Sequence, residues 1–150
     1  SSLNGLSATY DQYQNITLQT ANTKTLEGNI TVEDEFNFTG AGNYLQVGAF
    51  NVTIDDDGSI TNAGATAYFI VQPTSNTNGR LRQNDLSTAS RLFPIGSTAN
   101  YLPAIVTPVS SGTDFSVSVF RGTTTNGTPT GTPFGSRTFQ VDAVWMVDRT

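Results

Sequence analysis

The feature that most constrains this chain is hydrophobic alternation with a period of two residues, which recurs along most of its length. In the clearest run, Phe115, Val117 and Val119 alternate with Ser116 and Ser118, as in a strand with one buried face. Shorter alternations occur at Ile16/Leu18, Ile30/Val32, Phe36/Phe38, Leu45/Val47, Val52/Ile54 and Phe139/Val141/Ala143. No segment has the 3.6-residue periodicity of an amphipathic helix. The chain is therefore predicted to be all-β, with little or no helix.

Clusters of Gly, Asn and Asp separate the predicted strands, and these residues favour tight turns. About ten to thirteen short strands follow, which leaves two architectures open. One is a β-sandwich, and the other is an irregular β-helix-like stack with Greek-key or meander strands. We predict a single domain over residues 1–150, within which 1–73 would hold the repeat-like strands and 85–150 the sandwich-like strands.

A four-residue unit of the form Asn-apolar-Thr-apolar occurs three times, beginning at Asn15, Asn29 and Asn51. The unequal spacing of the units does not match a regular solenoid period. Each unit is expected to place its Asn at a turn, where the side chain binds local backbone, and to direct its two apolar residues inward.

Two runs, 68–71 and 144–147, are apolar at successive positions rather than at alternate ones. Strands buried on both faces have this pattern because neither face meets water. Both runs are therefore predicted to lie between two layers of the protein.

The charged and reactive residues exclude several functional classes. The net charge is −5 and Lys24 is the sole lysine, so the basic surface that nucleic acid requires is missing. The chain has no His and no Cys, which excludes Cys/His zinc sites and His-based catalytic triads. An enzyme would have to use two convergent carboxylates in a cleft, and we expect no enzymatic activity. No apolar run reaches the length of a membrane span.

Two acidic runs stand out. Asp55, Asp56 and Asp57 precede Gly58, which favours a hairpin turn with solvated carboxylates. The alternative is a calcium site formed by these three aspartates, although their spacing lacks the alternating ligands of an EF-hand; calcium is the one cofactor considered. The second run, 33–35, is expected to lie at a strand end and to discourage edge pairing.

Asn-x-Ser/Thr sequences mark candidate glycosylation sites, and they occur at Asn15, Asn29, Asn37, Asn51 and Asn126. For those in the Asn-apolar-Thr units, a structural role is favoured. Asn126 lies in a Thr- and Gly-rich segment that is expected to be an exposed loop.

Tyrosines and threonines offer two candidate binding surfaces. The five tyrosines could form a sugar-stacking platform with neighbouring amides; they are Tyr10, Tyr13, Tyr44, Tyr68 and Tyr101. A flat hydroxyl face would instead need Thr17, Thr31 and Thr53 to lie in register on the exterior. Most other aromatic residues fall in apolar runs and are expected in the core.

Two stretches of the chain resemble a known group of proteins. The first contains Tyr13-Gln14-Asn15-Ile16-Thr17-Leu18 and Lys24-Thr25-Leu26-Glu27-Gly28-Asn29-Ile30-Thr31-Val32, and the second contains Phe93-Pro94-Ile95-Gly96 and Tyr101-Leu102-Pro103. In this order they resemble repetitive, adhesin-like modules of secreted and surface-anchored proteins of Bacteroidota. The resemblance implies an extracellular or cell-surface location and a non-enzymatic role, and it brings no catalytic residue.

The low charge bears on how strand edges behave. Charged residues make up 13% of the chain, whereas 57 of 150 residues are Ser, Thr, Asn or Gln. Charges on edge strands normally block pairing with other chains, so few of them leave the edges free. The candidate assembly strands contain Leu3, Leu6, Ala8 and Tyr10 near one end, and Val141, Val144, Trp145 and Val147 near the other.

These observations favour a structural or adhesive extracellular β-module. Its partners would be copies of itself or adjacent modules, joined into a filament or multi-module surface protein by strand pairing in the manner of donor-strand polymers. The alternative is a carbohydrate- or surface-binding module, with polysaccharide as its partner.

Overall fold

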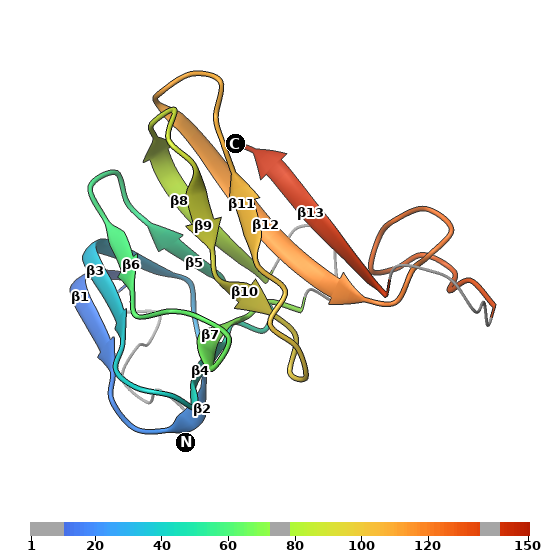
Figure 1. The fold of residues 1–150 in the computed structure, drawn as a ribbon, viewed down its shortest axis with the longest axis horizontal. Helices are drawn as coiled ribbons and strands as arrows, with labels where there is room; N and C mark the ends of the chain where they lie inside the picture. The colour runs from blue at the N-terminus through green and yellow to red at the C-terminus, as the bar shows by residue number, and fades with distance from the viewer. Residues whose placement is uncertain (1–10, 73–78, 136–141) are drawn as a thin grey trace.

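A computed structural model describes residues 11–72, 79–135 and 142–150, and the regular elements of these residues are strands (Figure 1). They are β1 (Gln12–Leu18), β2 (Asn22–Thr25), β3 (Ile30–Phe38), β4 (Asn43–Gln46), β5 (Asn51–Ile54), β6 (Ser59–Thr61), β7 (Ala67–Ile70), β8 (Arg80–Leu86), β9 (Arg91–Phe93), β10 (Ile95–Gly96), β11 (Ala104–Val106), β12 (Thr113–Arg121) and β13 (Ala143–Arg149). The prediction of an all-β fold with little or no helix is confirmed. Within the described ranges no helix is long and apolar enough to cross a membrane.

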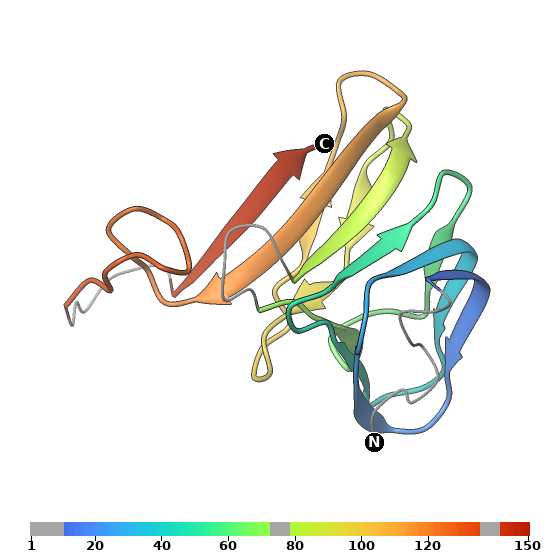
Figure 2. The same cartoon turned by 180° about the vertical axis from the view of Figure 1, so that it is seen from behind.

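The strands form two main sheets. Sheet A has the order β1-β3-β5-β8-β12-β13, with β6 also paired to β3, and sheet B has the order β10-β7-β4-β2. A small antiparallel pair, sheet C, joins β9 to β11. Figures 1 and 2 show β1 and β13 at opposite ends of the long sheet.

The chain alternates between sheets A and B as it advances. β1, β3, β5 and β8 are parallel neighbours in sheet A, and β2, β4, β7 and β10 are parallel neighbours in sheet B. β2, β4 and β7 therefore lie within the crossovers that join parallel strands of sheet A, which satisfies the need of such pairs for a long connection. β10 lies between β8 and β12, which are antiparallel. The result is the stack of coils of a β-solenoid. Of the two predicted architectures, the β-helix-like stack is the one observed.

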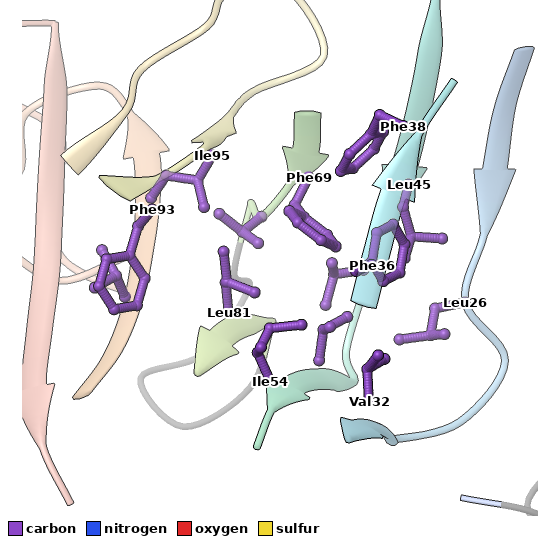
Figure 3. Packing of buried hydrophobic residues seen from close by; sticks show 14 of the residues in the cluster. Leu26, Val32, Phe36, Phe38, Leu45, Ile54, Phe69, Leu81, Phe93 and Ile95 are labelled. Atoms are coloured by element: carbon purple, nitrogen blue, oxygen red, sulfur yellow. The ribbon is translucent and has the colours of Figure 1, made fainter. Parts of the chain in front are cut away.

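Period-two alternation explains why the coils enclose a core. The inward rows of successive coils are in register, as in Ile30, Val52, Leu81 and Val117 of sheet A. In the same core the rings of Phe36 and Phe38, from β3, contact each other and that of Phe69, from β7 of sheet B, with centroids 4.7–5.1 Å apart (Figure 3). Stacking thus buries side chains that no single coil could cover alone. The run 68–71 is buried at every position, as predicted.

Both acidic runs lie elsewhere than expected. Residues 55–58 are a corner between β5 and β6, not a hairpin turn, because these two strands both pair in parallel with β3. An added Cβ at Gly58 would lie 2.7 Å from Cγ2 of Ile54 and 3.1 Å from the carbonyl oxygen of Val32, so the corner requires glycine. The prediction for 33–35 was wrong, because these residues lie in the middle of β3, between β1 on one side and β5 and β6 on the other.

The register explains the unequal spacing of the Asn-apolar-Thr units. The second and third units are direct neighbours, with Thr31 beside Thr53. The first unit instead pairs with the later half of β3, where Thr17 lies beside Asn37. The three threonines therefore do not form one row.

Candidate functional site

The two outermost strands of sheet A are the first candidate site. Among the described residues, β1 pairs with β3 alone and β13 pairs with β12 alone. Both are seven residues long. One long backbone edge of each strand is consequently open to a further strand.

β13 carries an exposed apolar row. Trp145 is 40% exposed and Val147 is 47% exposed, so the prediction that 144–147 is buried on both faces was wrong. The reason is that Trp145 lies beside Val119 and Val147 beside Val117, and these neighbours belong to the core. The two side chains continue the inward rows of the solenoid beyond β12 and remain partly exposed there.

The indole of Trp145 is held in place by a hydrogen bond. Its Nε1 donates to the backbone oxygen of Leu102 at 3.1 Å. The remaining predicted assembly residue on this strand, Val144, faces the opposite side of the sheet and is partly buried. Leu3, Leu6, Ala8, Tyr10 and Val141 lie outside the described residues.

β13 runs in the same direction as the parallel strands of sheet A. β12 is antiparallel to β8, and β13 is antiparallel to β12, so β13 runs in the same direction as β8 and β1. A translated copy that placed its β1 beside β13 would form a parallel pair, like the other pairs between coils.

The second candidate site lies on the outer face of sheet B, where three of the five tyrosines meet. The rings of Tyr44 and Tyr68 are 4.9 Å apart and those of Tyr68 and Tyr101 are 5.3 Å apart. The hydroxyl of Tyr68 donates to the backbone oxygen of Ser97 at 2.9 Å. Burial raises the pKa of Tyr68, with a smaller contribution from Tyr44, and burial alone raises that of Tyr101.

The other two tyrosines of the predicted platform are not part of this group. Tyr13 lies on β1 and packs against the core, and Tyr10 is outside the described residues. Comparison with protein-family models, with curated proteins and with solved structures returns no match. Function is therefore inferred from the chemistry of the β13 edge and of the tyrosine face.

Sequence reasoning missed how the tyrosines are brought together. Gly96 and Tyr101 form a bridge, which folds the segment after β10 back over sheet B. The pattern Phe-Pro-Ile-Gly followed by Tyr-Leu-Pro was the available signal, because it contains both bridge residues.

The aspartates at the corner do gather with other carboxylates. The pKa of Asp56 is raised, first by desolvation and then by repulsion from Asp55, Asp85, Asp114 and Asp57. Within the described residues no group of three or more acidic side chains is placed to hold a metal ion. The calcium site at Asp55, Asp56 and Asp57 stays a prediction.

Four of the five glycosylation candidates use their side-chain oxygen within the protein. Asn29 and Asn51 accept hydrogen bonds from the backbone of the next coil, and Asn37 accepts one from Asn62. Asn126 accepts from the backbone N–H of Thr128. Asn29 and Asn51 thus bind the backbone of the next coil and not local backbone, and Asn15 is exposed within β1. The prediction that each unit places its Asn at a turn to bind local backbone was therefore wrong.

Proposed function

We propose that this chain is a non-enzymatic structural module, exported to the cell surface or beyond, that assembles end to end with copies of itself. In this proposal β13 of one copy pairs with β1 of the next, so that sheet A continues from copy to copy. The observation that carries the proposal is the exposure of Trp145 and Val147, which continue the core rows at an open edge.

Solenoids normally close such an end. Terminal coils of soluble repeat proteins have polar outer surfaces, because the last coil has no neighbour to bury its apolar face. β13 instead offers a Trp and a Val at its open edge, and covering them would remove apolar surface from water at about 25 cal/mol per Å².

Strand length and charge favour β1 of a second copy as the occupant. β1 and β13 have equal length, and the directions of the two strands suit a parallel pair. β1 has no charged residue over 12–18, so repulsion would not oppose the pairing. The extracellular location rests on the sequence resemblance and on the Ser-, Thr-, Asn- and Gln-rich composition.

A charge placed on the β13 edge tests the proposal. We expect wild-type protein to form linear oligomers that grow with concentration in sedimentation velocity and are visible by electron microscopy. Val147→Lys should shift the protein to monomer, because the ammonium would have to be buried at the junction. The control is Val109→Lys, at a 98% exposed valine outside any strand, which should assemble like wild type.

Engineered cysteines test which strands meet. The chain has no natural cysteine, so Asn15→Cys on β1 and Met146→Cys on β13 introduce single thiols on the outer face of sheet A. When the two variants are mixed and oxidised, we expect a disulfide between them more readily than within either variant alone. Wild-type protein that remains monomeric at high concentration would overturn the proposal, and so would equal cross-linking in all three samples.

A further inference from the structure

A continuous groove crosses the outer face of sheet B. It consists of two adjoining hollows of about 430 and 480 Å³, which share Gln46, Ile70 and Thr98 as lining residues. The tyrosine group lies at one end, and Gln72 and Arg121 lie at the other.

The groove follows the direction of the strands. Its lining proceeds from Tyr44 through Gln46 to Gly48 on β4 and the residues after it, and the parallel neighbour β7 contributes Tyr68 and Ile70 in register. The strand from Tyr44 to Gln46 spans about 7 Å, and the lining continues beyond it into the turn at Gly48. The groove is therefore long enough for more than one unit of a linear polymer.

The chemistry of the lining combines flat apolar rings with neutral hydrogen-bonding groups. Tyr44 and Tyr101 are partly exposed, whereas Tyr68 between them is 4% exposed and supports both. Side-chain amides and hydroxyls line the rest, among them Gln46, which is exposed, and Thr98. Rings of this kind pack against the C–H face of a sugar, while amides and hydroxyls bind its hydroxyl groups.

Charge within the groove is low. Of the described lining residues, Arg121 alone is charged, and its guanidinium is bonded to Asp142 and to the side chain of Asn100. An anionic polymer would find no further cation there, and the net charge of the chain is −5. A neutral ligand meets neither repulsion nor a cost of separating ions.

From this geometry we propose that the groove binds a neutral polysaccharide, with Tyr44 and Tyr101 contacting sugar rings and Gln46 binding sugar hydroxyls. Tyr68 acts as a positioning residue, because its hydroxyl bond to Ser97 fixes the turn that carries Tyr101. A peptide added as a strand is not favoured, because the groove lies on a sheet face whose backbone groups are already paired. The site uses no residue of the β13 edge and is independent of assembly.

Affinity electrophoresis of the full chain tests the proposal. The gels contain one polysaccharide each: soluble mixed-linkage β-glucan, xylan or mannan as neutral probes, and polygalacturonate as the charged one. We expect retardation by at least one neutral probe that persists in about 0.5 M salt, because screening weakens charge–charge contacts only.

Variants locate the site. Tyr44→Ala and Gln46→Ala should each lower affinity, with a loss of about tenfold at Tyr44 if its ring is a central contact, whereas Tyr44→Phe should retain most of it. Thr53→Ala, on the outer face of sheet A, is the matched control and should bind like wild type, as should Val147→Lys. Near-UV circular dichroism checks that each variant is folded.

Three outcomes would overturn the proposal. The first is absence of retardation by every neutral probe. The second is retardation by polygalacturonate alone that salt abolishes, which would indicate an anion-binding surface. The third is unchanged affinity in Tyr44→Ala and Gln46→Ala, which would place binding elsewhere on the chain.

Discussion

The side-chain oxygen of Asn29 accepts a hydrogen bond from the backbone N–H of Asn51 at 2.9 Å, one coil further along the stack. Asn51 repeats the arrangement and accepts from the backbone N–H of Arg80 at 3.2 Å. The two asparagines thus join three successive coils at the point where each enters sheet A. They satisfy donors at the start of strands, where the backbone ladder has not yet begun.

This column of two asparagines, Asn29 and Asn51, predicts that Asn51→Ala lowers the free energy of unfolding more than Asn29→Ala does. The substitution at Asn51 removes the partly buried hydrogen bond between its side-chain oxygen and the N–H of Arg80, and we expect the free energy of unfolding to fall by about 1–2 kcal/mol. Asn29→Ala affects a more exposed donor, so water can replace the lost bond. Urea denaturation measures both, with Asn15→Ala as the exposed control. Equal effects at all three positions would contradict the structural role of the column.

The inward residues of the solenoid could be predicted from the sequence because side-chain alternation is a local property of a strand. Ile30, Val32, Val52 and Ile54 are all buried as their pattern indicates. The register between coils could not be predicted, because it depends on how many residues each turn of the coil takes up. Asn15 is 14 residues from Asn29 and still does not lie beside it.

The two candidate sites differ in how much of each could be predicted from the sequence. Run 144–147 is as apolar as run 68–71, yet the first lies at an edge and the second inside. Composition cannot distinguish them, because exposure depends on whether another coil follows. The tyrosines were identified from sequence, but their grouping depends on the bridge between Gly96 and Tyr101, a contact that period-two alternation does not encode.

Gly96 provides a prediction about that bridge. A Cβ at this position would lie 2.3 Å from the backbone oxygen of Asn100 and 2.7 Å from Cε2 of Tyr68. Gly96→Ala should therefore displace the turn over sheet B and lower stability by about 1–3 kcal/mol. The near-UV circular dichroism of the tyrosine group should change as well. Gly64→Ala is the control, because an added Cβ there meets no atom within 4 Å; a harmless Gly96→Ala would show that the turn adjusts freely.

Tyr13 and Tyr68 provide a matched pair of hydroxyl deletions. The hydroxyl of Tyr13 is buried and has no hydrogen-bond partner in the described part of the chain, whereas that of Tyr68 donates to the oxygen of Ser97. Tyr13→Phe should leave stability unchanged or raise it by up to about 1 kcal/mol, while Tyr68→Phe should lower it by about 1 kcal/mol. Thermal and urea denaturation of both variants measure the difference. The same sign of effect at both positions would contradict this assignment of their hydroxyls.

The hydrogen bonds of Asp114 predict how the stability of the fold changes as the pH falls. Its carboxylate accepts hydrogen bonds from the backbone N–H of Asp85 at 2.9 Å and from Arg82 at 2.6 Å. The backbone bond contributes most to holding the pKa of Asp114 below its ordinary value. The carboxylate therefore stabilises the fold above the unfolded-state pKa of about 4, and this contribution is lost as the pH falls through the folded-state pKa. Asp114→Asn should lower stability at neutral pH by about 1 kcal/mol, a modest figure because Arg82 is 36% exposed.

Asp56 has the opposite effect on the pH dependence of stability, because its pKa is raised whereas that of Asp114 is lowered. A carboxyl with a raised pKa destabilises the fold above that pKa, and this effect is relieved as the pH falls through it. This relief falls between the raised folded-state pKa of Asp56 and the unfolded-state value of about 4, whereas the loss at Asp114 falls below about pH 4. Asp114→Asn should therefore flatten the fall in stability below about pH 4, while Asp56→Asn should raise stability at neutral pH and leave the fall below about pH 4 largely unchanged. Urea denaturation at a series of pH values measures both slopes, and an Asp114→Asn variant that keeps the wild-type slope would show that its two hydrogen bonds do not favour the charged form.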